Sequence, residues 1–129
     1  MYCPKLILAE ITGVLVRYDV KLANLGYNVV LRNFNLKAES EIFDLVVDIC
    51  KRTGSRAVDA YFIATAKLMD SILVTNDKIM VSNAKRYGIE AYYLIDQFDL
   101  SFEEVVKSLI LTSCMIRYFL LTEFLKDQP

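Results

Sequence analysis

The segment from residue 72 to residue 95 alternates strand-like and helix-like sequence, and this pattern constrains the fold more than any other feature of the chain. Ile72–Thr75 is a continuous apolar run of strand length, and a helical pattern over 78–87 follows it and ends at Gly88. Residues 91–95 are again apolar and strand-like. A strand, a helix and a second strand in so short a segment form a βαβ unit, which requires neighbouring parallel strands. The sequence therefore predicts an α/β fold with a mostly parallel sheet.

Helical patterns occupy much of the remaining chain. Residues 4–18 and 37–53 each place their apolar side chains on one face, as surface helices do. Residues 55–69 are apolar or small on almost every side, which predicts a buried helix capped by Ser55. Residues 29–31 form a short apolar run that fits a strand or a connector.

The C-terminal residues 101–126 are predicted to form one long helix. Ser101 and Glu104 make a capping box at its start, and its apolar surface exceeds what one core face needs. A membrane span over 109–125 is disfavoured because an arginine and a glutamate would lie in hydrocarbon. We therefore expect this helix to pack against the domain or against a second subunit.

The composition limits the chemistry that the chain can perform. Its 129 residues, of which 55 % are hydrophobic, suit one compact domain spanning 1–129. The formal charge of -1 provides no global attraction for nucleic acid, so any such contact must be local. The absence of histidine excludes Ser-His and Cys-His catalysis and disfavours zinc. Widely spaced Cys3, Cys50 and Cys114, with no recognisable signal peptide, predict a cytoplasmic protein.

Three carboxylates stand where a reaction could use them, and each also has a plain structural explanation. Glu10 falls inside the apolar sector of its helix, as a salt-bridge partner or as a metal ligand. Asp59, near the start of the buried helix, interacts with the helix dipole or binds metal. Asp77 follows a strand, where it caps the next helix or joins a ligand site at the carboxyl end of a parallel sheet.

A basic cluster precedes Asp59 and consists of Lys51, Arg52 and Arg56. These side chains contact RNA phosphates beside an acidic site, or they complement the negative end of a helix, and both alternatives remain open. The acidic residues opposite the apolar face of helix 37–53 are expected in solvent: Glu41, Asp44 and Asp48.

Several of these segments together resemble the PIN-domain family. Residues 56–66, Arg-Ala-Val-Asp-Ala-Tyr-Phe-Ile-Ala-Thr-Ala, look like the helix that carries the third acid of PIN domains, and 73–78 resemble the family's strand ending in Thr-x-Asp. Residues 84–94 resemble the next helix, glycine turn and last strand, and 4–17 are similar to the helix with the second acid. The resemblance covers 4–96 and implies a three-layer α/β/α fold.

What the resemblance implies is a Mg²⁺- or Mn²⁺-dependent endoribonuclease, often the toxin of a VapBC-type toxin-antitoxin pair and often a homodimer. In such a site carboxylates hold the metal, and the metal activates water. Carried over residue by residue, Glu10, Asp59 and Asp77 take the metal-binding and catalytic roles. The supporting residues are Thr75 and Asn76, with Asp96 as an additional candidate.

The chain departs from the family pattern at its start. PIN domains begin with a strand that bears the first of four acids, whereas this sequence starts at about the end of the second strand. We therefore expect an N-terminally truncated fold with three ligands and a sheet that is open in its middle. The alternative to RNA cleavage is a catalytically degenerate interaction or dimerisation protein, in which helix 101–126 covers the sheet or a partner. A response-regulator-like or nucleotide-binding domain is disfavoured, because no glycine-rich phosphate loop is present.

Overall fold

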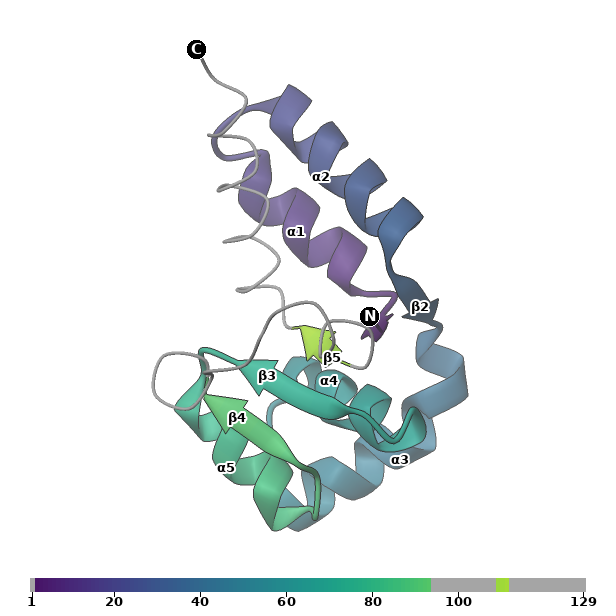
Figure 1. Cartoon of the computed structure of the whole chain (residues 1–129), viewed down its shortest axis with the longest axis vertical. Coiled ribbons are helices and arrows are strands. Elements are labelled where there is room, and N and C mark those ends of the chain that lie inside the picture. Colours follow the sequence, from purple (N-terminus) through teal and green to yellow (C-terminus); the bar gives the residue numbers. More distant parts are fainter. Residues whose placement is uncertain (1, 94–108, 112–129) are drawn as a thin grey trace.

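The computed structural model describes residues 2–93 and 109–111, and these form a five-stranded parallel sheet with helices around it (Figure 1). The strand order is β2-β1-β5-β3-β4, and every pairing in it is parallel. The strands are β1 (Tyr2–Pro4), β2 (Asn35–Lys37), β3 (Ile72–Thr75), β4 (Ala91–Tyr93) and β5 (Leu109–Leu111). The predicted α/β class with parallel strands is confirmed.

The βαβ unit that the sequence predicts is present as β3, α5 (Lys78–Arg86) and β4. Leu73 lies opposite Ala91 in the register of the two parallel strands. Gly88 follows α5 with a φ of +89°, a left-handed conformation that glycine adopts without steric cost. The chain therefore reverses where the sequence predicts, although the last part of the predicted strand, residues 94 and 95, lies outside the described residues.

Four further helices surround the sheet: α1 (Ile7–Leu15), α2 (Val20–Asn33), α3 (Glu39–Thr53) and α4 (Ala57–Leu68). Two of these helices, α1 and α2, pack as a pair at one end of the molecule, and α3 packs against α4 (Figure 1). Helix α4 also contacts β1, β3 and β5. Its nearly uniform apolar sequence is explained by this central position, in which Phe62 and Ile63 are fully buried.

The start of the chain differs from the prediction. The helix expected from residue 4 begins only at Ile7, because residues 2–4 form β1. Pro4 is tolerated as the last residue of β1, since the register with β5 involves Tyr2 alone. The ambiguous apolar run 29–31 lies within α2 and is neither a strand nor a connector.

Ser55 does not cap the buried helix as predicted. Arg56 is the N-cap residue of α4, and the Ser55 hydroxyl lies 2.6 Å from that of Thr53. Gly54 ends α3 with a φ of +70°, which directs the chain back towards the sheet. This tight turn sets the position of Arg56 at the start of α4.

The predicted long C-terminal helix is wrong for residues 109–111, which form β5, and the rest of 101–126 lies outside the described residues. Strand β5 lies between β1 and β3, so the expectation of a sheet open in its middle is also wrong. Leu-Ile-Leu suits a buried strand as well as a helix, and apolar periodicity alone does not distinguish the two. Within the part of the chain that the structure describes, no helix is long and apolar enough to cross a membrane.

Candidate functional site

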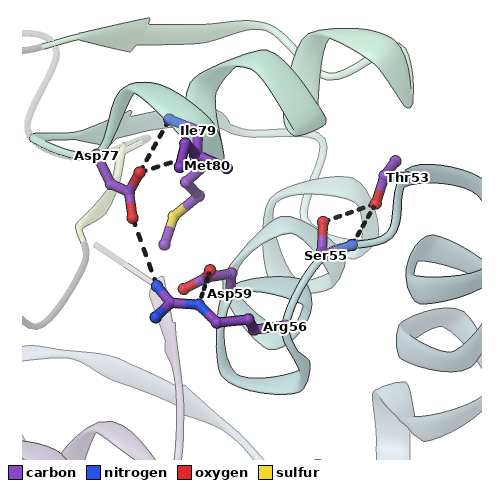
Figure 2. Close-up of polar contacts among 7 residues, drawn as sticks. All are labelled: Thr53, Ser55, Arg56, Asp59, Asp77, Ile79 and Met80. Carbon is purple, nitrogen blue, oxygen red and sulfur yellow. Dashed lines mark hydrogen bonds and ion pairs between the residues drawn. The ribbon is translucent and has the colours of Figure 1, made fainter.

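Arg56 lies between the carboxylates of Asp59 and Asp77 and contacts both (Figure 2). Its Nε donates a hydrogen bond to Asp59 Oδ2 at 3.0 Å. Its terminal nitrogen Nη2 lies 3.7 Å from Asp77 Oδ2, within ion-pair distance. One cationic group therefore joins two acids that come from the first turn of α4 and from the carboxyl end of β3.

Asp77 performs the capping role that its position predicts and also faces Arg56. Its Oδ1 accepts hydrogen bonds from the backbone N–H groups of Ile79 at 2.9 Å and Met80 at 3.2 Å, which caps α5. The Asp77 N–H donates to Thr75 Oγ1 at 3.1 Å, and Thr75 is buried at the end of β3. These bonds fix Oδ1 and the backbone, so Oδ2 is the oxygen directed towards Arg56.

Asp59 is the most buried of the acids that the structure brings together. Its side chain is 9 % exposed, whereas that of Arg56 is 79 % exposed. A buried carboxylate needs a cation or hydrogen-bond donors, and Arg56 supplies both. The hydrogen bond that Arg56 donates to Asp59 raises the pKa of the Arg56 guanidinium, with smaller contributions from the negative charges of Asp59 and Asp77.

Glu10 is half-buried on α1, with its Oε2 atom shielded from solvent. Within residues 2–93 and 109–111, however, no three aspartate, glutamate or cysteine side chains are grouped so as to hold a metal ion. The structure thus brings Asp59 and Asp77 together without adding Glu10 to a three-ligand set. Asn76 is exposed beside Asp77, and Asp96 lies outside the described residues.

The basic cluster divides into separate environments. Arg56 contacts the acids, whereas Arg52 forms an ion pair with Asp48 at 3.2 Å and lies 5.9 Å from the ring centroid of Tyr87. Lys51 is exposed on α3. Asp48, which the sequence places in solvent, is half-buried in the structure. Besides its ion pair with Arg52, it accepts a hydrogen bond of 2.5 Å from the Tyr87 hydroxyl.

Three contacts of this region were not predicted from the sequence: Arg56 with Asp59, Arg56 with Asp77, and Lys78 with Tyr93. The spacing of Arg56 and Asp59, three residues apart at a helix start, is a recognisable ion-pair signal. The contact of Arg56 with Asp77 is tertiary and leaves no such signal. In addition, Lys78 Nζ lies 5.1 Å from the ring centroid of Tyr93, which places a cation and an aromatic ring just after β3 and at the end of β4.

The two acids fit a hard divalent cation. Asp59 and Asp77 each direct an Oδ2 atom at the same guanidinium, so both oxygens reach one shared cationic group. Mg²⁺ keeps several water ligands and is commonly held by only one or two carboxylates together with substrate phosphates. A pair of converging carboxylates is therefore chemically sufficient to bind it.

Comparison with known protein families identifies the family of the chain. The model of the PIN domain matches residues 1–86, a range that includes Asp59, Asp77 and the whole of α5. PIN domains are a family of Mg²⁺-dependent nucleases. No curated protein and no solved structure matches the chain. The match decides against a response-regulator-like or nucleotide-binding domain, and the chain belongs to the PIN-domain family.

Proposed function

We propose that the protein is a Mg²⁺- or Mn²⁺-dependent endoribonuclease. The observation that supports this most directly is the convergence of Asp59 and Asp77 on one cationic group beyond the end of β3, in a chain of a nuclease family. The carboxyl ends of parallel strands are where α/β folds bind their ligands. The acid pair thus has both the ligand type that a divalent metal needs and the position in the sheet where such ligands are bound.

In this proposal Asp59 and Asp77 are the metal ligands, and Glu10 on α1 is a candidate third ligand that the structure does not group with them. The bound metal would provide a water molecule of lowered pKa and neutralise negative charge on the phosphate. Thr75 is a positioning residue, because its hydroxyl accepts the N–H of Asp77 and so orients that carboxylate. Asn76, exposed at the same turn, is placed to contact RNA.

The finer assignments rest on the resemblance to the family alone and belong to the same proposal. RNA is the proposed substrate, with Lys51, Arg52 and Arg56 as candidates for phosphate contacts. The proposal also includes a toxin role in a toxin-antitoxin pair with an antitoxin partner. It further includes a homodimer and a cytoplasmic location. Of the three basic residues, Arg56 is the one whose contact with the acids supports a role beside the site.

A cleavage assay on end-labelled single-stranded RNA tests the proposed activity. We expect cleavage that requires Mg²⁺ or Mn²⁺ and falls roughly a hundredfold or more in Asp77→Asn, since even outer contacts to a metal site are commonly worth 10–100-fold. Asp70→Asn is the matched control, because Asp70 is exposed and has a φ of +48° that asparagine also adopts. Cleavage that needs no metal, or activity of Asp77→Asn equal to that of the wild type, would contradict the proposal.

A second candidate function is a catalytically degenerate PIN-like protein that acts by binding a partner or a second copy. The observation in its favour is that Arg56 already neutralises the two acids, while the described residues contain no group of three metal-binding side chains. This candidate predicts no metal-dependent cleavage by the wild-type chain. It also predicts that Asp77→Asn retains the same oligomeric state in size-exclusion chromatography with light scattering.

A further inference from the structure

We propose that Arg56 is a built-in competitor of the metal: the guanidinium and a divalent cation bind the same two carboxylate oxygens, and metal binding requires Arg56 to leave. This inference rests on the proposed function, because it assumes that Asp59 and Asp77 are metal ligands. Under this inference, Arg56 lowers the affinity of Asp59 and Asp77 for a divalent ion.

The competition follows from which oxygens are available. Oδ1 of Asp77 is committed to the N–H groups of Ile79 and Met80, so Oδ2 is left for an external cation. That same Oδ2 is the atom 3.7 Å from Arg56 Nη2. Oδ2 of Asp59 is likewise the atom that accepts the hydrogen bond from Arg56 Nε at 3.0 Å. A metal ion bound to both Oδ2 atoms would compete with the guanidinium for them and be repelled by its charge.

Arg56 is placed to move aside. Its side chain is 79 % exposed, and its backbone at the N-cap of α4 is extended, with φ -63° and ψ 150°. An exposed arginine side chain can turn into water without exposing core surface. Two contacts to carboxylates hold it in place. The one to Asp77, whose side chain is 33 % exposed, is open to solvent, and ion pairs of this kind are weak.

Asp59, by contrast, cannot remain without a cation. Its carboxylate is 9 % exposed at the start of a helix, so loss of Arg56 leaves a buried negative charge that favours any replacement cation. A carboxylate oxygen is a ligand that hard divalent cations prefer. Departure of Arg56 should therefore increase the affinity of the acid pair for a divalent ion.

The rival explanation is that Arg56 and Asp59 form only a structural ion pair at the beginning of α4. A structural pair predicts that removing Arg56 lowers stability and leaves metal affinity unchanged or lower. The competitor role predicts that removing Arg56 tightens metal binding. The two explanations thus predict opposite changes in metal affinity when Arg56 is removed.

The experiment is a titration of the full chain with Mn²⁺, followed by isothermal calorimetry and by the electron paramagnetic resonance signal of free Mn²⁺. Since Arg56 itself is largely exposed and solvent screens its attraction to the acids, we expect Arg56→Gln to lower the Kd for Mn²⁺ only about three- to tenfold. Arg56→Met, which keeps the aliphatic stem without the charge, should show the same gain. Arg52→Gln is the matched control for the loss of one positive charge, because Arg52 pairs with Asp48 and not with Asp59 or Asp77, and its Kd should stay at the wild-type value.

The outcomes separate this inference from the proposed function. Mn²⁺ binding that Asp77→Asn abolishes, but that Arg56→Gln and Arg56→Met leave unchanged or weaken, overturns the competitor role and keeps the metal site. If neither the wild type nor the Arg56 variants bind Mn²⁺ at millimolar concentrations, both the inference and the metal-dependent function fail. A gain of equal size in Arg52→Gln would also overturn the inference, since it would reflect net charge alone.

Discussion

Ile110 of β5 lies in register with Leu73 of β3, and it also pairs with Tyr2 of β1. The strand order places β2 and β1 on one side of β5, and β3 and β4 on the other. A C-terminal segment therefore joins the two halves of a sheet whose other four strands come from the first 93 residues. Glu10 lies on α1, which follows β1, and Asp77 follows β3. Strand β5 therefore connects the strand that precedes Glu10 to the strand that precedes Asp77.

Ile110→Pro should destabilise the protein strongly. Proline removes a backbone N–H donor and is poorly tolerated in a central strand, with a cost of about 3 kcal/mol in comparable regular structure. Urea unfolding followed by circular dichroism measures this loss. Ile110→Val keeps the N–H group and suits a strand, so its midpoint should stay near the wild-type value. Equal midpoints for the proline and valine variants would contradict the central position of β5.

Asp77 combines two roles that substitution can separate. Asparagine caps helices about as well as aspartate, so Asp77→Asn should leave the urea midpoint nearly unchanged while it removes the charge that binds metal. Asp77→Ala should lose the cap as well, at about 1 kcal/mol. Comparing the free energy of unfolding with the Kd for Mn²⁺ in both variants tests this separation. A large stability loss in Asp77→Asn would show that its charge, through Arg56, matters more than the cap.

Thr75→Val should affect the site through Asp77. The valine side chain has nearly the same shape but cannot accept the Asp77 N–H, so a polar group next to a buried position loses its partner. The expected cost is about 1–2 kcal/mol in urea unfolding, together with weaker Mn²⁺ binding. Thr65→Val is the control, because that buried hydroxyl bonds the carbonyl oxygen of Tyr61 within α4. Weakened Mn²⁺ binding in both variants would point to a general loss of stability and not to the hydrogen bond between Thr75 and Asp77.

The sequence predicted those parts of the fold in which local pattern and tertiary position agree. The unit β3-α5-β4 was recognisable because an apolar run, an amphipathic helix and a glycine at positive φ follow one another. Strands β1, β2 and β5 have three residues each, and runs so short resemble helix ends or connectors. These three segments form strands because they pair with segments that are distant in sequence, and a local pattern does not show such pairing.

The site was predictable in its residue types and less so in its geometry. Helical periodicity placed Glu10 on the apolar side of α1, and its carboxylate is indeed half-buried. Asp59 and Asp77 were brought together by family resemblance, whereas the bridge through Arg56 depends on how α4 packs against β3. The sequence suggested either RNA or a helix end as the partner of Arg56. The structure instead shows a contact with the two acids themselves.

Tyr87→Phe should reduce stability in a pH-dependent manner, because the Tyr87 hydroxyl links α5 to Asp48 on α3. The pKa of Asp48 is lowered, first by this hydrogen bond and then by the charge of Arg52, so the stabilisation is present above the ordinary value of 3.8 and is lost as pH falls through the lowered pKa. The pKa of Tyr87 is raised from 10.0 by the same bond, so the stabilisation is also lost as pH rises through that raised pKa.

Urea midpoints should therefore differ between Tyr87→Phe and the wild type at pH 7 and converge at pH values well below 3.8. Tyr92→Phe is the matched control, because the Tyr92 hydroxyl bonds Glu90, only two residues away on the exposed surface. A local contact of that kind links no two helices, so its removal should hardly change the midpoint. If the Tyr87→Phe difference were the same at every pH, the lost contact would be packing of the ring and not the hydrogen bond to Asp48.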